Sequence, residues 1–182
     1  MTMTPRVRKL ALTAHVTSSV GWLGAVVSFL ALAIAGMASQ DTQTVRAVYL
    51  AMELTGRYVL VPFSLASLLT GLVQSLGTKW GLFRHHWVLA KLTINVFANI
   101  VLLMYIQTLG RLADVAADMT LLSSELSELR SPTAVIHSGG ALLLLLVATA
   151  LSVYKPQGMT RYGQRKQHGK NRLPPGEPAS AT

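Results

Sequence analysis

Three polar residues lie at helical spacing inside one apolar run of this chain. Lys91, Asn95 and Asn99 are four residues apart, so on an α-helix all three side chains share one face. An ammonium group and two amides facing hydrocarbon would be costly, because no water is present there to satisfy them. We therefore expect this face to point into the interior of a helical bundle. For Lys91 alone, a structural alternative is that its long side chain reaches back to a nearby water interface.

His15, in the first apolar run, is a second candidate for chemistry. It lies six residues in from Lys9, or roughly 9 Å at the helical rise of about 1.5 Å per residue. Lys91 lies four residues in from Trp87 on the same predicted side, so the side chains of His15 and Lys91 can meet. An imidazole can ligate a metal or accept a proton. It can equally be held by one hydrogen bond to a neighbouring helix, and the sequence leaves both readings open.

His137 lies near the opposite surface, six residues into the last apolar run. His15 and His137 therefore differ in depth by more than one haem iron could bridge, and we expect no haem clamped between them. Thioethers suit Cu(I), although methionine is also ordinary packing material. A copper hypothesis follows for residues near this surface, namely His137, Met37, Met52 and Met104, with Met119 nearby.

Glu53 and Arg57 lie four residues apart, just before the fully apolar part of the second run. If the helix protrudes from the bilayer, Arg57 sits at the level of the lipid headgroups. If it does not, the two residues form an intramembrane ion pair facing the interior, where charges usually have a purpose.

The elements that must position these residues are four long apolar segments. The runs without Asp, Glu, Lys or Arg are 10–40, 58–78, 92–110 and 131–154. Each has about the 20 residues that a helix needs to cross a bilayer, and four such helices, apolar on every side, would be unusual in a soluble protein. The mean hydropathy of +0.45 agrees. We predict an all-α integral membrane four-helix bundle, with spans at about 9–37, 50–77, 87–109 and 132–154.

Charge predicts the sidedness of these spans. The net charge is +9, and the basic residues gather in the N-terminal lead 1–8 with Lys9, in the middle turn, and in the tail 155–182. The acidic residues concentrate in the other two connections, at Asp41, Asp114, Asp118, Glu125 and Glu128. By the positive-inside rule, both termini and the middle turn are cytoplasmic.

The two longest polar segments have different expected structures. The connection 110–131 has helical periodicity and predicts an amphipathic helix on the outer face. The tail is rich in Pro, Gly and like charges, so we expect it to be disordered. Anionic lipid headgroups are its expected partners, and nucleic acid is not expected.

Several classes of site are excluded. The chain has no cysteine, so disulfides and thiolate metal ligands are impossible. It also lacks a phosphate-binding loop, a nucleophile elbow, a zinc motif and a dinucleotide fingerprint. Whether the chain is an enzyme, and whether it forms homo-oligomers, is left open.

Four sequence motifs carry a resemblance to a known family. They are His15 followed by GWLGA at 21–25, VPFSLASLLTGL at 61–72, WGLFRHHWVLAKL at 80–92 and YKPQGMTRYG at 154–163. With these motifs the chain resembles the four-helix membrane proteins of the copper-resistance D and HemJ-type protoporphyrinogen oxidase superfamily. It looks closest to a bacterial branch with no established activity, which implies the bacterial inner membrane.

The resemblance also implies a cofactor. In the oxidase family a first-helix histidine and a lysine that opens the third helix are functional, and they are associated with a porphyrin or haem b. His15 and Lys91 match these positions. We therefore predict a porphyrin or haem site around His15, Lys91, Asn95 and Asn99. The alternatives are a copper or small-molecule transport protein and an accessory or structural membrane subunit.

Overall fold

The computed structural model describes residues 3–77, 82–118, 129–156 and 158–165, and within these ranges the chain is almost entirely helical with no strand. The elements in chain order are α1 Pro5–Ala38, α2 Thr42–Thr55, the π-helix η1 Gly56–Leu60, α3 Val61–Gly77, α4 His86–Ala117 and α5 Thr133–Tyr154. Because α2, η1 and α3 are continuous, they form one long helix. The prediction of an all-α chain with four helices long and apolar enough to cross a membrane is confirmed.

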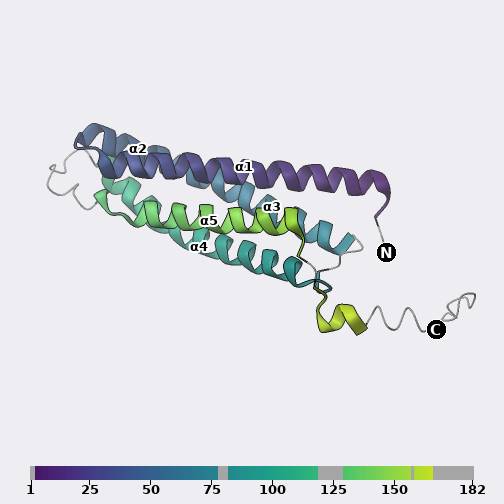
Figure 1. Cartoon of the computed structure of the whole chain (residues 1–182). Coiled ribbons are helices and arrows are strands. Elements are labelled where there is room, and N and C mark those ends of the chain that lie inside the picture. Colours follow the sequence, from purple (N-terminus) through teal and green to yellow (C-terminus); the bar gives the residue numbers. More distant parts are fainter. Residues whose placement is uncertain (1–2, 78–81, 119–128, 157, 166–182) are drawn as a thin grey trace, which may run out of the picture.

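The four long helices lie side by side (Figure 1). Both α1 and α4 pack against the helix formed by α2, η1 and α3, and both pack against α5, so α1 and α4 are diagonally opposite. The beginning of α1, the α3–α4 turn and the end of α5 lie at one end, which we call the basic end. There the backbone N–H of Met3 donates to the carbonyl of Gly77 over 3.3 Å.

The π-helix is the one irregular turn in the helix formed by α2, η1 and α3. It ends two residues before Pro62, which has no N–H to donate to the carbonyl of Tyr58. A wider turn at this point is one way to accommodate the missing hydrogen bond, and single π turns inside α-helices often lie at functional sites. Gly56 and Leu60 of this turn are both buried.

Helix α4 is longer than the apolar run that predicts it. Leu109, Ala113 and Ala116 follow at spacings of four and three residues and are each at most 2 % exposed. Their burial on one helix face explains why α4 continues to Ala117, into the segment expected to be the outer connection. Residues 119–128 of that predicted amphipathic connection lie outside the described residues.

Buried hydrogen bonds tie the helices together at the end opposite the basic end. Arg46 of α2 is only 7 % exposed, and its guanidinium donates to the carbonyl of Ala116 over 2.8 Å and to the carbonyl of Asp118. The Tyr49 hydroxyl donates to the carbonyl of Leu129. The Arg46 guanidinium also places a positive charge at the last carbonyls of α4, where the helix dipole favours a cation. This end of α4 is therefore fixed against α2.

At the basic end, residues 158–165 pack against the α3–α4 turn, and we call them the strap. The Thr160 backbone N–H donates to the carbonyl of Arg84 over 3.0 Å, and its hydroxyl donates to the carbonyl of Phe83 over 2.5 Å. Met159 pairs with His85 in an isolated antiparallel bridge. The strap belongs to the segment 155–182 that is expected from the sequence to be disordered. Residues 166–182 of the predicted tail lie outside the described part of the chain.

Candidate functional site

His15 on α1 is held by a tertiary contact with α3. Its Nδ1 lies 3.2 Å from the carbonyl oxygen of Ser67 and 3.2 Å from the Thr70 hydroxyl oxygen. A carbonyl oxygen can only accept, so Nδ1 carries the proton and Nε2 keeps its lone pair. Within the described part of the chain, Nε2 has no hydrogen-bond partner. The half-buried imidazole is therefore oriented to offer a nitrogen ligand or a proton acceptor.

Small and hydroxylic residues surround this histidine. Ser19 of α1 and Ser67 of α3 join their hydroxyls over 2.8 Å. Gly71 faces the imidazole so closely that a Cβ placed on it would lie 3.0 Å from His15 Cε1. Ser67 and Gly71 are four residues apart and share one face of α3. Their small size lets α1 and α3 approach at His15.

Lys91 lies near His15, although it comes from the diagonally opposite helix. Its ammonium interacts electrostatically with His15 and with Lys155, and Nζ lies 5.7 Å from the centre of the Trp87 ring. Within the described ranges the acidic residues all lie toward the opposite end of the bundle, at Asp41, Glu53, Asp114 and Asp118. The surroundings of His15 and Lys91 are thus positively charged.

Asn95 and Asn99 make their hydrogen bonds within α4. The side-chain amide of Asn95 donates to the carbonyl of Lys91 over 3.0 Å, and that of Asn99 donates to the carbonyl of Asn95 over 2.9 Å. Asn99 is only 3 % exposed, and its Oδ1 has no hydrogen-bond partner among the described residues. The polar stripe therefore leaves one buried acceptor unused.

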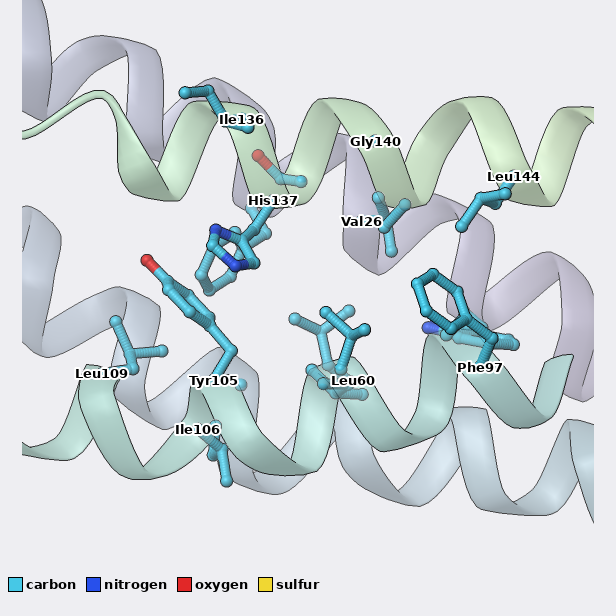
Figure 2. Close-up of a pocket in the computed structure, with 18 residues that line it drawn as sticks. Val26, Leu60, Phe97, Tyr105, Ile106, Leu109, Ile136, His137, Gly140 and Leu144 are labelled. Carbon is cyan, nitrogen blue, oxygen red and sulfur yellow. The ribbon is translucent and has the colours of Figure 1, made fainter. Parts of the chain in front are cut away.

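A cavity of about 220 Å³ lies between α1, η1, α4 and α5, in the half of the bundle away from the basic end. Its walls are almost entirely apolar, and Figure 2 shows Tyr105 and His137 at one side, Phe97 at the other, and Val26 and Leu60 between them. The four residues of the predicted porphyrin site do not line it. Sequence periodicity identifies the inward face of each helix. It does not show where four packed helices leave a gap, so the cavity was not predicted.

Tyr105 and His137 form an aromatic pair in the cavity wall. Their ring centres lie 4.4 Å apart and their planes differ by 19°. Tyr105 is 8 % exposed, and its hydroxyl has no hydrogen-bond partner within the described part of the chain. His137 Nδ1 donates to the carbonyl of Thr133 over 2.8 Å, so its Nε2 also keeps a lone pair. The aromatic pair thus leaves one buried hydroxyl without a partner among the described residues.

The remaining predicted site residues lie elsewhere. Glu53 and Arg57 form an ion pair of 2.9 Å, and the side chain of Arg57 is 57 % exposed. Met52 is fully buried, whereas Met37 and Met104 are exposed, so these sulfurs have different environments. Met119 lies outside the described residues. No group of three or more His, Asp or Glu side chains that could hold a metal occurs among the described residues.

Comparisons of this chain with protein-family models, with curated proteins and with solved structures find no match.

Proposed function

We propose that this chain is a multi-pass protein of the bacterial inner membrane, with the basic end in the cytoplasm. Large apolar side chains on the outer faces of all four long helices support this. Leu10, Tyr58, Leu69, Met104 and Leu143 are each more than half exposed. Such a surface is favourable against lipid and unfavourable against water. The gathering of acidic residues at the other end supports the orientation.

Reporter fusions test the orientation. Alkaline phosphatase, which is active only outside the cytoplasm, should be active when fused after residue 40. Green fluorescent protein, which fluoresces only inside, should fluoresce when fused after residue 165. The reverse pattern would overturn the orientation.

We infer that His15 would hold the iron of a bound porphyrin through Nε2, in keeping with the family resemblance. The observation that carries this inference is the hydrogen bond from His15 Nδ1 to the carbonyl of Ser67. A metal-ligating histidine almost always donates its second ring N–H to a carbonyl or carboxylate, which fixes the ring and makes the ligating nitrogen more basic. Nε2 of His15 is the nitrogen left for the metal.

The charge near His15 suits the rest of a porphyrin. Lys91 supplies an ammonium group that interacts electrostatically with the imidazole, and porphyrins of the haem pathway carry propionate carboxylates. A charge-assisted bond to a carboxylate stabilises a buried ammonium that has no acidic side chain nearby. Bound haem b would supply a redox-active iron, His15 would orient it, and Lys91 would pair with an acidic substituent.

A visible absorption spectrum of the protein, purified in mild detergent, tests this function. We expect a Soret band in the wild type, lost in His15→Ala while circular dichroism shows the helices intact. His137→Ala is the matched control, because that histidine has the same protonation pattern and should keep the band. A helical wild-type protein that is colourless and does not shift the spectrum of added hemin would overturn the proposal.

A further inference from the structure

We propose that the strap, residues 158–165, is a docking site for the headgroup of an anionic phospholipid, whose phosphate is bound by the side chains of Arg161 and Arg165. The inference rests on the membrane placement proposed above, with the basic end at the cytoplasmic surface, but it does not depend on a porphyrin at His15. The packing of the strap, the charge that it presents and the aromatic side chains around it support it.

The strap has one face buried against the α3–α4 turn. Residues 161–165 form a helical turn, and Thr160 and Gly163 are buried. The backbone N–H of Gly163 donates to the Thr160 hydroxyl over 3.1 Å, and the Thr160 backbone N–H donates to the carbonyl of Arg84 over 3.0 Å. A Cβ placed on Gly163 would lie 2.5 Å from that carbonyl oxygen, so glycine is what allows the close approach. These contacts give the strap one orientation on the bundle.

The opposite face of the strap carries positive charge. Arg161 and Arg165 are four residues apart, so they share one side of the helical turn, with Tyr162 next to them. All three residues are exposed. Within the described part of the chain, neither guanidinium has a hydrogen bond or an ion pair. A guanidinium can bind phosphate through two parallel N–H groups, so two guanidiniums on one face suit the phosphate of a lipid headgroup.

Other basic residues at the same end increase the attraction for an anion. Arg6 and Arg8 lie in the first turn of α1, and Lys155 follows the end of α5, and all three are exposed. The acidic side chains in the described ranges all lie toward the other end of the bundle, so none of them competes for these cations. Basic residues next to a membrane-spanning helix are attracted to anionic headgroups.

Exposed aromatic side chains indicate that the anion belongs to a lipid. Tyr162 of the strap and Phe83 of the α3–α4 turn are each 57 % exposed, and Tyr154 at the end of α5 is 83 % exposed. Figure 1 shows the strap beside the end of α5 and the beginning of α4. Aromatic rings at the ends of membrane-spanning helices lie at the level of the headgroups. A soluble phosphate would leave these rings in water, whereas a phospholipid would cover them and place its phosphate at the arginines.

The probe is dioctanoyl phosphatidylglycerol, an anionic phospholipid with short chains, titrated into the protein in a neutral detergent. Native mass spectrometry counts the bound lipid and gives an apparent Kd. Each basic residue near an anionic lipid contributes about a fivefold factor, so two contribute about 25-fold. We therefore expect phosphatidylglycerol to bind about 25-fold more tightly than dioctanoyl phosphatidylcholine, which has no net charge. The double variant Arg161→Gln with Arg165→Gln should lose most of this preference.

Two further variants separate the strap from the charge of the basic end as a whole. Arg6→Gln with Arg8→Gln removes two exposed charges at the beginning of α1 and should change phosphatidylglycerol binding little. Gly163→Ala keeps every charge, but its Cβ would meet the carbonyl oxygen of Arg84, so the strap must move. We expect this variant to bind phosphatidylglycerol more weakly although its charge is unchanged. Glycerol 3-phosphate, which carries the phosphate without acyl chains, should compete only weakly.

Four outcomes would overturn the proposal. They are equal binding of the two lipids, equal losses in the two double variants, wild-type binding by Gly163→Ala, and competition by glycerol 3-phosphate as strong as that by phosphatidylglycerol. The last outcome would indicate a site for a soluble phosphate. Circular dichroism identifies variants that fail to fold, and the exposed arginines keep the test decisive if Gly163→Ala is among them.

The lipid site and the porphyrin site can fail separately. His15→Ala should bind phosphatidylglycerol normally, and the double variant of Arg161 and Arg165 should keep the Soret band. The reporter fusions test the orientation of the chain without reference to either ligand.

Discussion

Two histidines of the bundle, His15 on α1 and His137 on α5, both donate Nδ1–H to a backbone carbonyl. For His15 the carbonyl belongs to Ser67 on α3, a different helix. For His137 it belongs to Thr133, four residues earlier on the same helix. The orientation of His15 therefore depends on how α1 packs against α3, whereas His137 is oriented locally and would keep its hydrogen bond if α5 moved.

The surroundings of the two histidines also differ in polarity. His15 lies among hydroxyl groups and near the Lys91 ammonium, at the end where basic residues gather. His137 stacks on Tyr105 at an apolar cavity. The same imidazole chemistry thus has hydroxylic, positively charged surroundings in one half of the bundle and apolar surroundings in the other.

The largest expected effect comes from loosening the half that contains His137. Arg46→Ala removes the guanidinium that donates to the carbonyls of Ala116 and Asp118 at the end of α4. Hydrogen bonds to a charged group contribute about 1.5 to 3 kcal/mol each, so we expect the free energy of unfolding to fall by about 3 kcal/mol or more. Thermal unfolding in detergent micelles, followed by circular dichroism, measures the loss.

Arg111→Ala is the control for this prediction, because Arg111 is an exposed arginine near the C-terminal end of α4. It should change the stability little. Equal losses in the two variants would show that the buried contacts of Arg46 do not stabilise this half of the bundle.

The helices of this fold are predictable from the sequence because their cause is local. The absence of charge over about 20 residues is enough to identify each long helix. Counting residues from Lys9 and from Trp87 also puts His15 and Lys91 at one level, and in the structure the two interact electrostatically. The extension of α4 to Ala117 is visible only in the spacing of Leu109, Ala113 and Ala116, which continues beyond the apolar run.

The cavity and its polar groups were not predictable, because they depend on contacts between helices. Periodicity places Tyr105 and His137 on their own helices but does not show that the two rings stack. The role of Arg46 is hidden for the same reason, since its partners are the carbonyls of Ala116 and Asp118, 70 or more residues away. Pro62 marks an irregular turn but does not reveal that this turn is a π-helix.

A smaller effect is expected from Gly71→Ala, a substitution that changes the surroundings of His15 and not those of His137. In Gly71→Ala the new Cβ would lie 3.0 Å from His15 Cε1, so the imidazole must move by a few tenths of an ångström. The helix propensity of alanine, worth up to about 1 kcal/mol over glycine, offsets this crowding, and the stability should change little. The Soret band should shift or weaken.

Gly24→Ala is the matched control for that substitution. Its Cβ meets no atom within 4 Å, so its Soret band should equal that of the wild type. If Gly71→Ala left the band unchanged, the assignment of the pigment to His15 would be wrong.

The smallest effect is expected at Asp41, which precedes α2 outside the long helices. Its carboxylate accepts hydrogen bonds from the Thr44 hydroxyl over 2.6 Å, the Thr44 backbone N–H over 3.0 Å and the Gln43 backbone N–H over 3.3 Å. These bonds hold the pKa of the Asp41 carboxyl below its ordinary value, and the bond from the Thr44 hydroxyl has the largest effect. The ionised carboxylate is therefore the form that stabilises the beginning of α2.

The sign of the pH dependence follows from this lowered pKa. The contribution of Asp41 to stability is fully present above the pKa of the unfolded chain, about 3.9, and is lost as the pH falls through the lower pKa of the folded protein. We expect Asp41→Asn to keep much of the helix cap and to lower the melting temperature slightly at pH 7, with the difference from the wild type shrinking below pH 4. Melting curves of both proteins between pH 7 and pH 3 measure this. A difference that stays constant over that range would show that the charge of Asp41 contributes nothing. Because Asp41 lies at the opposite end of the bundle from His15, the Soret band should not respond to the change.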